Sequence, residues 1–395
     1  MEAITNRRKR WPWILALALI IIGTAVYQLY FVSTNAAIRH AEAFLFRRMS
    51  VAQLADQGSY RFFYASNREP GSSAGEIAER FTSTVTDSLS FGSYDTTIEP
   101  NLGLGMLINP TQWLQDEEIQ LQDVNTLDEK LFIQGLRDQV AGSSHQAVLV
   151  ALHGFRENYE SALRKTAFLG HVLDIDAPVL LFDWPGDQGS SLRGYRRARS
   201  VASESGTQLA ELLMLLATDV QPREIWILAN SMGAQVVVDA MQVLHGRGQA
   251  QGKFQHIVLT APDVDHRQFN EQFKQQLDYL SEHLTVYVSS NDRALLVSRV
   301  LNRGARRGES TLSPEQLDEA ERILDLTARG DKLVNLVDVT PVNRTRNFHN
   351  FSLETPEFFD DLFLRLTNPQ VPNSRPIYHV QTPEGKVYSV LTRGR

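Results

Sequence analysis

The sequence predicts an α/β fold with a mostly parallel sheet and helices on both faces, preceded by one transmembrane helix. From residue 146 onward, short apolar runs that suit buried strands alternate with amphipathic helical segments, which is typical of right-handed βαβ crossovers. Near the N-terminus, an uncharged apolar stretch is long enough to cross a bilayer as a helix. The predicted strands are 148–152, 179–182, 225–229, 256–260 and 284–288.

The composition limits what the protein can be. The chain has 395 residues, of which 43% are hydrophobic, so it can bury one large core or two modest ones. Its net charge of −7 lacks the basic excess that is typical of nucleic-acid-binding proteins. Because the chain has no cysteine, disulfides, thiolate metal sites and cysteine nucleophiles are excluded. Covalent catalysis would need another nucleophile, and we expect neither a metal ion nor an organic cofactor.

The N-terminus predicts a signal-anchor. A basic cytoplasmic tail, 1–10, precedes the predicted transmembrane segment, 11–32. The basic cluster places the N-terminus in the cytoplasm and the remaining chain in the periplasm or outside the cell. A cleaved signal peptide is the alternative, since Thr34 and Ala36 suit a cleavage site, but the apolar region exceeds the usual length of about 7–15 residues.

The rest of the chain divides into a main domain and its flanks. We expect a juxtamembrane segment over 33–59, the main domain over 60–368 and a C-terminal tail over 369–395. Within the main domain, 60–145 is interpreted as an N-terminal extension, with a separate domain as the alternative. An apolar run at 60–65 predicts a strand in that extension.

Helices are predicted between the strands of the main domain. Apolar residues at helical spacing indicate a helix over 159–173 and another over 201–216, directly before the third predicted strand. In an open α/β sheet, ligands bind beyond the carboxyl ends of the strands. Reactive side chains should therefore be sought just after each strand.

The segment 224–241 holds the candidate nucleophile, Ser231. It reads as a buried strand, a reversal at 229–233 and then a helix. A serine on such a turn is held clear of the sheet, and the small residues Ala229 and Gly233 let strand and helix pass closely. This is the nucleophile-elbow pattern with alanine in place of its first glycine. An ordinary turn that contains a serine is the alternative.

An activated serine needs a base, and in a fold with this elbow the order along the chain is serine, acid, histidine. His349 is the candidate base, because it lies in a loop-like segment before the helix-like 355–366. Most other histidines after Ser231 begin, end or lie inside predicted strands and helices.

Two positions are open for the acid. Asp292 follows the strand 284–288 and precedes His349 by one crossover, so it is preferred. Asp263 or Asp265, after the preceding strand, is the alternative, although Asp265 suits an N-cap of the next helix-like segment.

Further site residues are expected around the nucleophile. The glycine of His153-Gly154-Phe155 permits a tight turn after the first predicted strand, so the backbone N–H groups of Phe155 and Met232 are the candidate oxyanion hole. His153 is expected to anchor the loop. Trp184 and Asn230 are candidate pocket residues. Between the candidate acid and base, 293–330 is a lid-like insertion, with a fixed covering helix as the alternative.

These motifs resemble those of alpha/beta-hydrolases, and specifically the esterase/lipase-superfamily enzymes formerly described as a domain of unknown function. The resemblance spans about 60–368, and it implies the alpha/beta-hydrolase fold with a triad of Ser231, Asp292 and His349. It implies no substrate. Where that family usually has histidine before the serine, this chain has Asn230. The segments that carry the resemblance are 62–68, 153–155, 182–185, 230–233, 261–265, 291–295 and 349–351.

The sequence therefore predicts a membrane-anchored serine hydrolase that cleaves small-molecule or lipid-like carboxylic esters through an acyl-enzyme. A thioesterase or peptidase would use the same triad and differ only in its pocket. A non-catalytic binding or scaffold protein with this fold is the alternative from another class, since a fold does not imply a function.

Overall fold

The computed structural model describes residues 59–72, 75–98, 119–189, 191–248, 254–264, 276, 280–289, 334–343, 351–367, 377–381 and 387–392. The predicted transmembrane segment 11–32 and the lid-like insertion 293–330 lie outside the described residues. Within the described ranges, no helix has the length and apolar character needed to cross a membrane.

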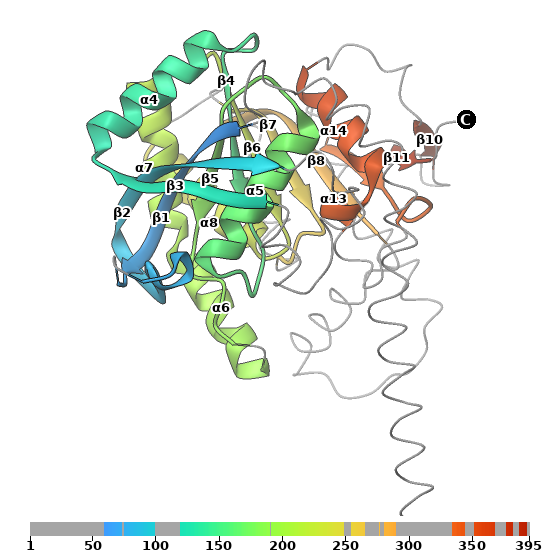
Figure 1. The fold of residues 1–395 in the computed structure, drawn as a ribbon. Helices are drawn as coiled ribbons and strands as arrows, with labels where there is room; N and C mark the ends of the chain where they lie inside the picture. The colour runs from blue at the N-terminus through green and yellow to red at the C-terminus, as the bar shows by residue number, and fades with distance from the viewer. Residues whose placement is uncertain are drawn as a thin grey trace, which may run out of the picture.

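The described strands form one eleven-stranded sheet, which runs through the middle of the molecule in Figure 1. The strand order is β10-β11-β9-β8-β7-β6-β4-β5-β1-β2-β3. Pairing is parallel from β1 through β5, β4, β6, β7, β8 and β9 to β11, whereas β2, β3 and β10 pair antiparallel. The bounds are β1 Ser59–Pro70, β2 Phe81–Ile98, β3 Ile119–Leu127, β4 Ala147–Leu152, β5 Val179–Asp183, β6 Glu224–Asn230, β7 Phe254–Thr260, β8 Ser281–Val288, β9 Val334–Asp338, β10 Ile377–Gln381 and β11 Val387–Leu391.

The five strands predicted from apolar runs correspond to β4, β5, β6, β7 and β8, so the mostly parallel sheet is confirmed. The predicted strand at 60–65 is part of β1, which pairs in parallel with β5. In this arrangement Ser66 of β1 lies beside Asp183, the last residue of β5. The N-terminal strand therefore reaches the edge of the sheet where the central parallel strands end.

Helices cover both faces of the sheet (Figure 1). One face packs against α4 Glu129–Gly142, α6 Leu192–Glu204, α7 Gly206–Leu215 and α8 Gly233–Gly246. The other packs against α5 Tyr159–Leu173, α13 Phe351–Glu354 and α14 Pro356–Thr367. This two-layered covering explains why the parallel strands are apolar on both faces.

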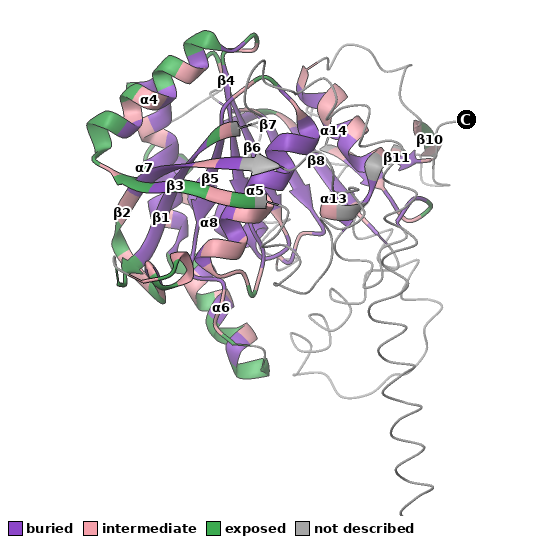
Figure 2. Ribbon diagram, in the orientation of Figure 1, coloured by how far each residue is buried: buried purple, intermediate pink, exposed green. Residues whose placement is uncertain are grey.

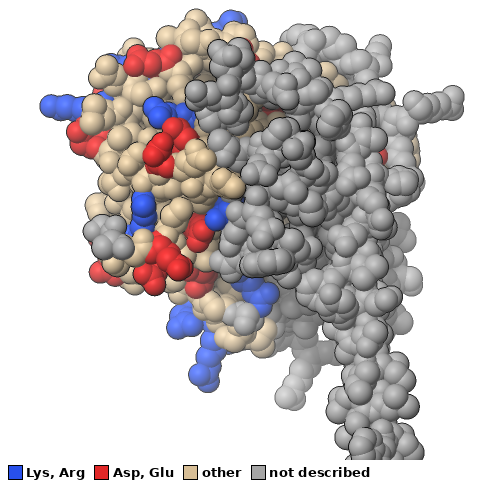
Figure 3. Space-filling view, in the orientation of Figure 1, with Lys and Arg blue, Asp and Glu red and all other residues tan. Residues whose placement is uncertain are grey.

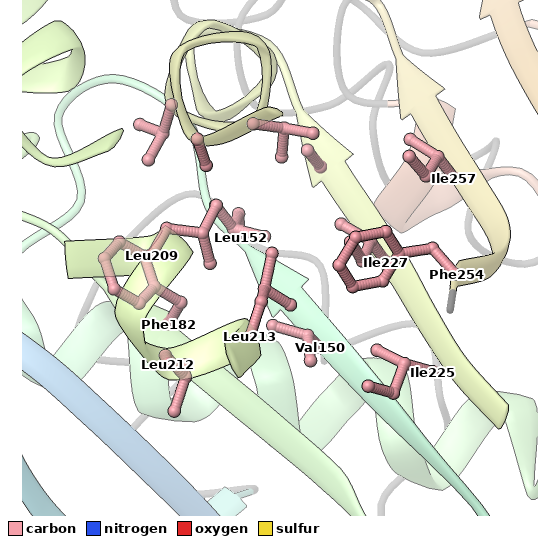
Figure 4. Packing of buried hydrophobic residues seen from close by; sticks show 14 of the residues in the cluster. Val150, Leu152, Phe182, Leu209, Leu212, Leu213, Ile225, Ile227, Phe254 and Ile257 are labelled. Atoms are coloured by element: carbon pink, nitrogen blue, oxygen red, sulfur yellow. The ribbon is translucent and has the colours of Figure 1, made fainter. Parts of the chain in front are cut away.

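Alternation along β6 shows how one strand serves both cores. Ile225 and Ile227 face the core under α7 and α8, while Trp226 and Leu228 face the core under α5. Figure 4 shows Ile225 and Ile227 packed with leucines of α7 and with β4 and β7. The central parallel strands are accordingly buried along most of their length, whereas the outer strands β2 and β3 are partly exposed (Figure 2).

Outside the cores, the surface carries both signs of charge. On the face shown in Figure 3, acidic and basic side chains of the described residues are interspersed. This mixture agrees with the modest net charge of the chain.

The helix predicted over 201–216 differs from the structure, because the chain breaks into α6 and α7 at Ser205. The Ser205 hydroxyl donates to the Val201 carbonyl at 2.8 Å, a bond that tends to bend helices. Gly206 follows at a close approach to α8, since a Cβ there would lie 2.6 Å from the Asp239 side chain. The bend thus brings α7 onto α8, which local periodicity does not predict.

Candidate active site

Ser231 lies on a strained turn between β6 and α8. Its φ of +52° is in the left-handed region, which residues other than glycine rarely adopt. The Ser231 N–H donates to the Thr260 carbonyl at 2.9 Å, and the Ser231 carbonyl accepts from the Asp263 N–H at 3.1 Å. Both bonds come from the end of β7 and the residues just after it. The end of β7 and the residues just after it therefore hold the strained serine through both its N–H and its carbonyl group.

Small residues allow the turn to pack against the loop after β4. A Cβ added to Gly154 would lie 3.0 Å from the Ser231 Cβ, so this loop touches the candidate nucleophile. A Cβ added to Gly233 would lie 2.5 Å from the His153 carbonyl oxygen. Ala229, in contrast, is buried in the core beneath α8 and accommodates its methyl group there. The alanine at the first position of the pattern is therefore compatible with the elbow.

The loop after β4 holds the candidate oxyanion donors. Within the described residues, neither the Phe155 N–H nor the Met232 N–H donates to a backbone carbonyl. The N–H of the next residue is bonded, since the Arg156 N–H donates to the Gly186 carbonyl at 2.9 Å. An oxyanion donor must have an N–H that is available to the substrate oxygen, so the lack of a backbone bond at these two amides is consistent with the role. The oxyanion hole itself stays a prediction.

His153 anchors this loop to the next one. Its Nδ1 lies 2.9 Å from the Gly154 carbonyl oxygen. Its Nε2 lies 3.1 Å from Asp183 Oδ1, and the Trp184 indole N–H donates to the His153 carbonyl at 2.9 Å. Trp184 is fully buried and stacks on the imidazole. It supports the loop from inside the core.

Asn230 connects the elbow to the segment that follows the candidate base. Its side-chain oxygen accepts from the Thr260 hydroxyl at 3.0 Å and from the Ser352 hydroxyl at 3.2 Å. Asn230 also lines a cavity of about 60 Å³, together with residues of β4, the following loop, α5 and α13. The cavity is lined by Ala151, Leu152, His153, Gly154, Glu157, Lys165, Thr166, Leu169, Leu228, Asn230, Thr260, Ser352 and Leu353.

The candidate acids and base are only partly described. Asp292, Asp265 and His349 lie outside the described residues, so the triad stays a prediction. Asp263 is described, and its carboxylate accepts from the Tyr195 hydroxyl of α6 at 2.7 Å. That bond ties the Asp263 side chain to α6.

Comparison with known families agrees with this geometry. The sequence profile of a family described as "Alpha/beta hydrolase of unknown function (DUF900)" matches residues 129–362, which is more than half of the chain. The chain belongs to this family. The resemblance inferred from the motifs is thereby confirmed, and the protein is an alpha/beta hydrolase.

No curated protein matches the sequence of this alpha/beta hydrolase. Among solved structures, a mutant of the type II thioesterase YbtT from the yersiniabactin NRPS/PKS biosynthetic pathway is 17% identical over 55% of this chain and 95% of its own, with a TM-score of 0.26. The thioesterase RedJ from the prodiginine biosynthetic pathway in Streptomyces coelicolor is 14% identical over 56% of this chain and 86% of its own, with a TM-score of 0.29. Likenesses this distant carry no argument about substrate.

Two residues of this alpha/beta hydrolase that lie against the candidate site, Arg68 and Asp183, were not assigned a role from the sequence. They form a salt bridge of 2.9 Å with side chains 1% and 0% exposed. The local signal was a polar run, Ser66-Asn67-Arg68, directly after apolar residues in a predicted strand. Nothing in the sequence pairs that run with Asp183, because the two segments meet only through the β1–β5 register.

Proposed function

We propose that this alpha/beta hydrolase is a serine hydrolase that cleaves carboxylic esters through an acyl-enzyme, with Ser231 as its nucleophile. The observation that carries the proposal is the left-handed backbone of Ser231 at the strand-to-helix turn. Strain of this kind persists only where the surrounding structure enforces it, and it is common at active sites. An ordinary turn would not need to hold a serine in this conformation against the glycine of a neighbouring loop.

The proposed reaction has two steps. The Ser231 hydroxyl oxygen bonds to the acyl carbon while its proton passes to His349, and the carbonyl electron pair moves onto the oxygen. The Phe155 and Met232 amides donate to that oxyanion. When the intermediate collapses, the ester C–O bond breaks and the alcohol leaves with the proton from His349. Water then attacks the acyl-enzyme with the same base, and this step releases the acid and restores the serine.

The triad acid holds the His349 imidazole in the tautomer that accepts the serine proton, and Asp292 is the preferred residue for this role. Asp265 is the alternative residue for this role. The distinction matters because both follow parallel strands that end at the same edge of the sheet as Ser231.

The side chains next to Ser231 suit an ester with an apolar part. Phe155 packs edge-on against Tyr195 with ring centroids 5.7 Å apart, and both are partly buried. Tyr195 is connected to the nucleophile turn through Asp263. A small-molecule or lipid-like ester is therefore the proposed substrate class.

We also propose that residues 11–32 anchor the enzyme in a membrane, with the N-terminus cytoplasmic and the catalytic domain extracytoplasmic. The support is the sequence alone, in which basic residues precede an uncharged apolar stretch. An anchored enzyme of this kind would act on esters at or near the membrane surface.

The decisive experiment is fluorophosphonate labelling and aryl-ester hydrolysis by the full chain and by its Ser231→Ala variant in detergent. We expect the probe to label the wild-type chain and not the Ser231→Ala variant. Turnover should fall on the order of 10⁴-fold or more in the variant. Matched thioester and peptide substrates show whether the pocket favours another acyl compound. Wild-type turnover in Ser231→Ala would refute the assignment of the nucleophile, and a well-folded wild-type chain without labelling or turnover would favour a binding protein.

A further inference from the structure

Arg68 is held by more bonds than any simple ion pair requires. Its Nε donates to the Asp183 carboxylate, and one terminal nitrogen, Nη1, donates to Asp187 at 2.6 Å and to the Thr82 carbonyl at 3.3 Å. The other, Nη2, donates to the Glu157 carbonyl at 2.8 Å and to the Trp184 carbonyl at 2.9 Å. All five N–H groups of the guanidinium are therefore used.

Asp183 joins this arginine to the loop after β4. Its carboxylate accepts from the Ser66 hydroxyl at 2.8 Å as well as from Arg68, and His153 Nε2 lies 3.1 Å away. Burial alone would raise the pKa of the Asp183 carboxyl, but Arg68 and His153 hold that pKa below its usual value. The carboxylate is thus charged while completely buried.

These bonds fix the loop 153–157 at both ends. At its start, Asp183 contacts the His153 ring, and the Trp184 indole N–H donates to the His153 carbonyl. At its end, Arg68 holds the Glu157 carbonyl. Phe155 lies between these anchored residues, and its amide is the candidate oxyanion donor.

Stability alone gives a weak reason for such a network. Burying an ion pair costs a desolvation penalty that its mutual attraction only partly offsets, and apolar replacements are often no less stable. Oxyanion stabilisation, in contrast, needs donors held within about 0.5 Å of the productive geometry. A misplacement of about 1 Å can lower the rate about 10²-fold.

We propose that Arg68 and Asp183 are positioning residues that hold the loop 153–157 so that the Phe155 amide meets the developing oxyanion. This inference rests on the proposed serine-hydrolase function. The arginine comes from β1, so the N-terminal strand contributes to the geometry of the active site without touching the substrate.

The test compares Asp183→Asn with Arg68→Lys in the full chain. Asp183→Asn removes the buried charge at nearly constant shape. Arg68→Lys keeps the positive charge, but its one nitrogen carries three donors, so it cannot replace all the bonds that the guanidinium makes to Asp183, to Asp187 and to the three backbone carbonyls. Fluorophosphonate titration counts the folded active sites, so that kcat is expressed per competent site. We expect kcat to fall about 10²-fold in each variant with KM within about 3-fold, because the oxyanion forms only in the transition state.

Thr96→Val is the matched control. It removes a buried 2.9 Å contact between Thr96 of β2 and His171. Thr96 pairs with Tyr60, which lies about 20 Å along β1 from Ser66. We expect its melting temperature to fall while kcat per site stays within about 3-fold of the wild-type value. A fall in kcat comparable to that of Asp183→Asn would show that any loss of buried bonding slows the enzyme, and would overturn the proposal.

The pH dependence separates positioning from proton transfer. We expect Asp183→Asn to keep the shape of the kcat/KM profile, whereas a shifted profile would assign Asp183 to the acid–base machinery and overturn the proposal. Wild-type kcat per site in both Asp183→Asn and Arg68→Lys would also overturn it. If the two variants have wild-type kcat and Ser231→Ala is inactive in the same assay, only the positioning role has failed. If Ser231→Ala is active, the proposed function itself has failed.

Discussion

Gly233→Ala tests whether the close approach of α8 to the loop after β4 sets the geometry of the site. The added methyl carbon would lie 2.5 Å from the His153 carbonyl oxygen and 3.2 Å from the Leu152 Cβ. Ordinary carbon–oxygen contacts begin at about 3.3 Å, so the start of α8 and the loop must separate by about 0.8 Å. The nearest atom is a backbone oxygen, and the Leu152 Cβ is bonded directly to the backbone of β4, so no flexible side-chain end can absorb the change.

The expected consequence follows from what that displacement moves. The Met232 amide is adjacent to Gly233, and Ser231 precedes it, so nucleophile and oxyanion donor shift together relative to Phe155. A displacement of this size should lower ester turnover about 10²-fold. Overpacking should cost about 1–3 kcal/mol of unfolding free energy, well short of unfolding a stable domain.

Gly246→Ala is the control for this prediction, because it makes the same change at the other end of α8. A Cβ at Gly246 meets nothing within 4 Å. Its turnover should equal that of the wild type, and its stability should be unchanged or slightly higher. Measuring aryl-ester kcat and thermal unfolding for both variants decides the matter. Turnover in Gly233→Ala within about 3-fold of wild type would refute the link between this packing and catalysis.

Two further predictions concern residues outside the described part of the chain. Asp292→Asn should lower turnover by about 10⁴-fold without loss of stability, whereas Asp265→Asn, as a lost helix cap, should cost about 1 kcal/mol with turnover nearly unchanged. The reverse pattern in ester turnover and melting temperature would move the acid to Asp265. A reporter that is active only outside the cytoplasm, fused after Arg395, should be active, and the N-terminus should begin before Trp11. A mature chain beginning near Ala37 would instead show a cleaved, exported enzyme.

The central sheet and the elbow could be predicted because their signals are local. An apolar run such as 225–229, followed by helical spacing from Ala234, needs no distant partner to be recognised. The carboxyl ends of parallel strands lie at one edge, so the order of motifs also brought the loop at Gly154 toward Ser231.

The buried support of the site could not be predicted, because its partners are far apart in sequence. Arg68 and Asp183 are separated by 115 positions, and only the β1–β5 register brings them together. The division of the helix at Ser205 also depends on a distant partner, since the Asn67 side chain donates to the Ser205 hydroxyl at 2.9 Å. Both features involve polar residues that follow Ala65 in β1.

The position of β1 in the sheet has a consequence for how the chain folds. β1, β2 and β3 pair with one another in sequence order, so they can form soon after synthesis. The other edge of β1 pairs with β5, and this pairing begins at Leu180, opposite Phe63. Until that segment is made, β1 presents unpaired backbone groups together with Arg68, and an exposed strand edge of this kind invites pairing with other chains. The interval before β5 docks is therefore a stage at which the nascent protein is exposed to aggregation.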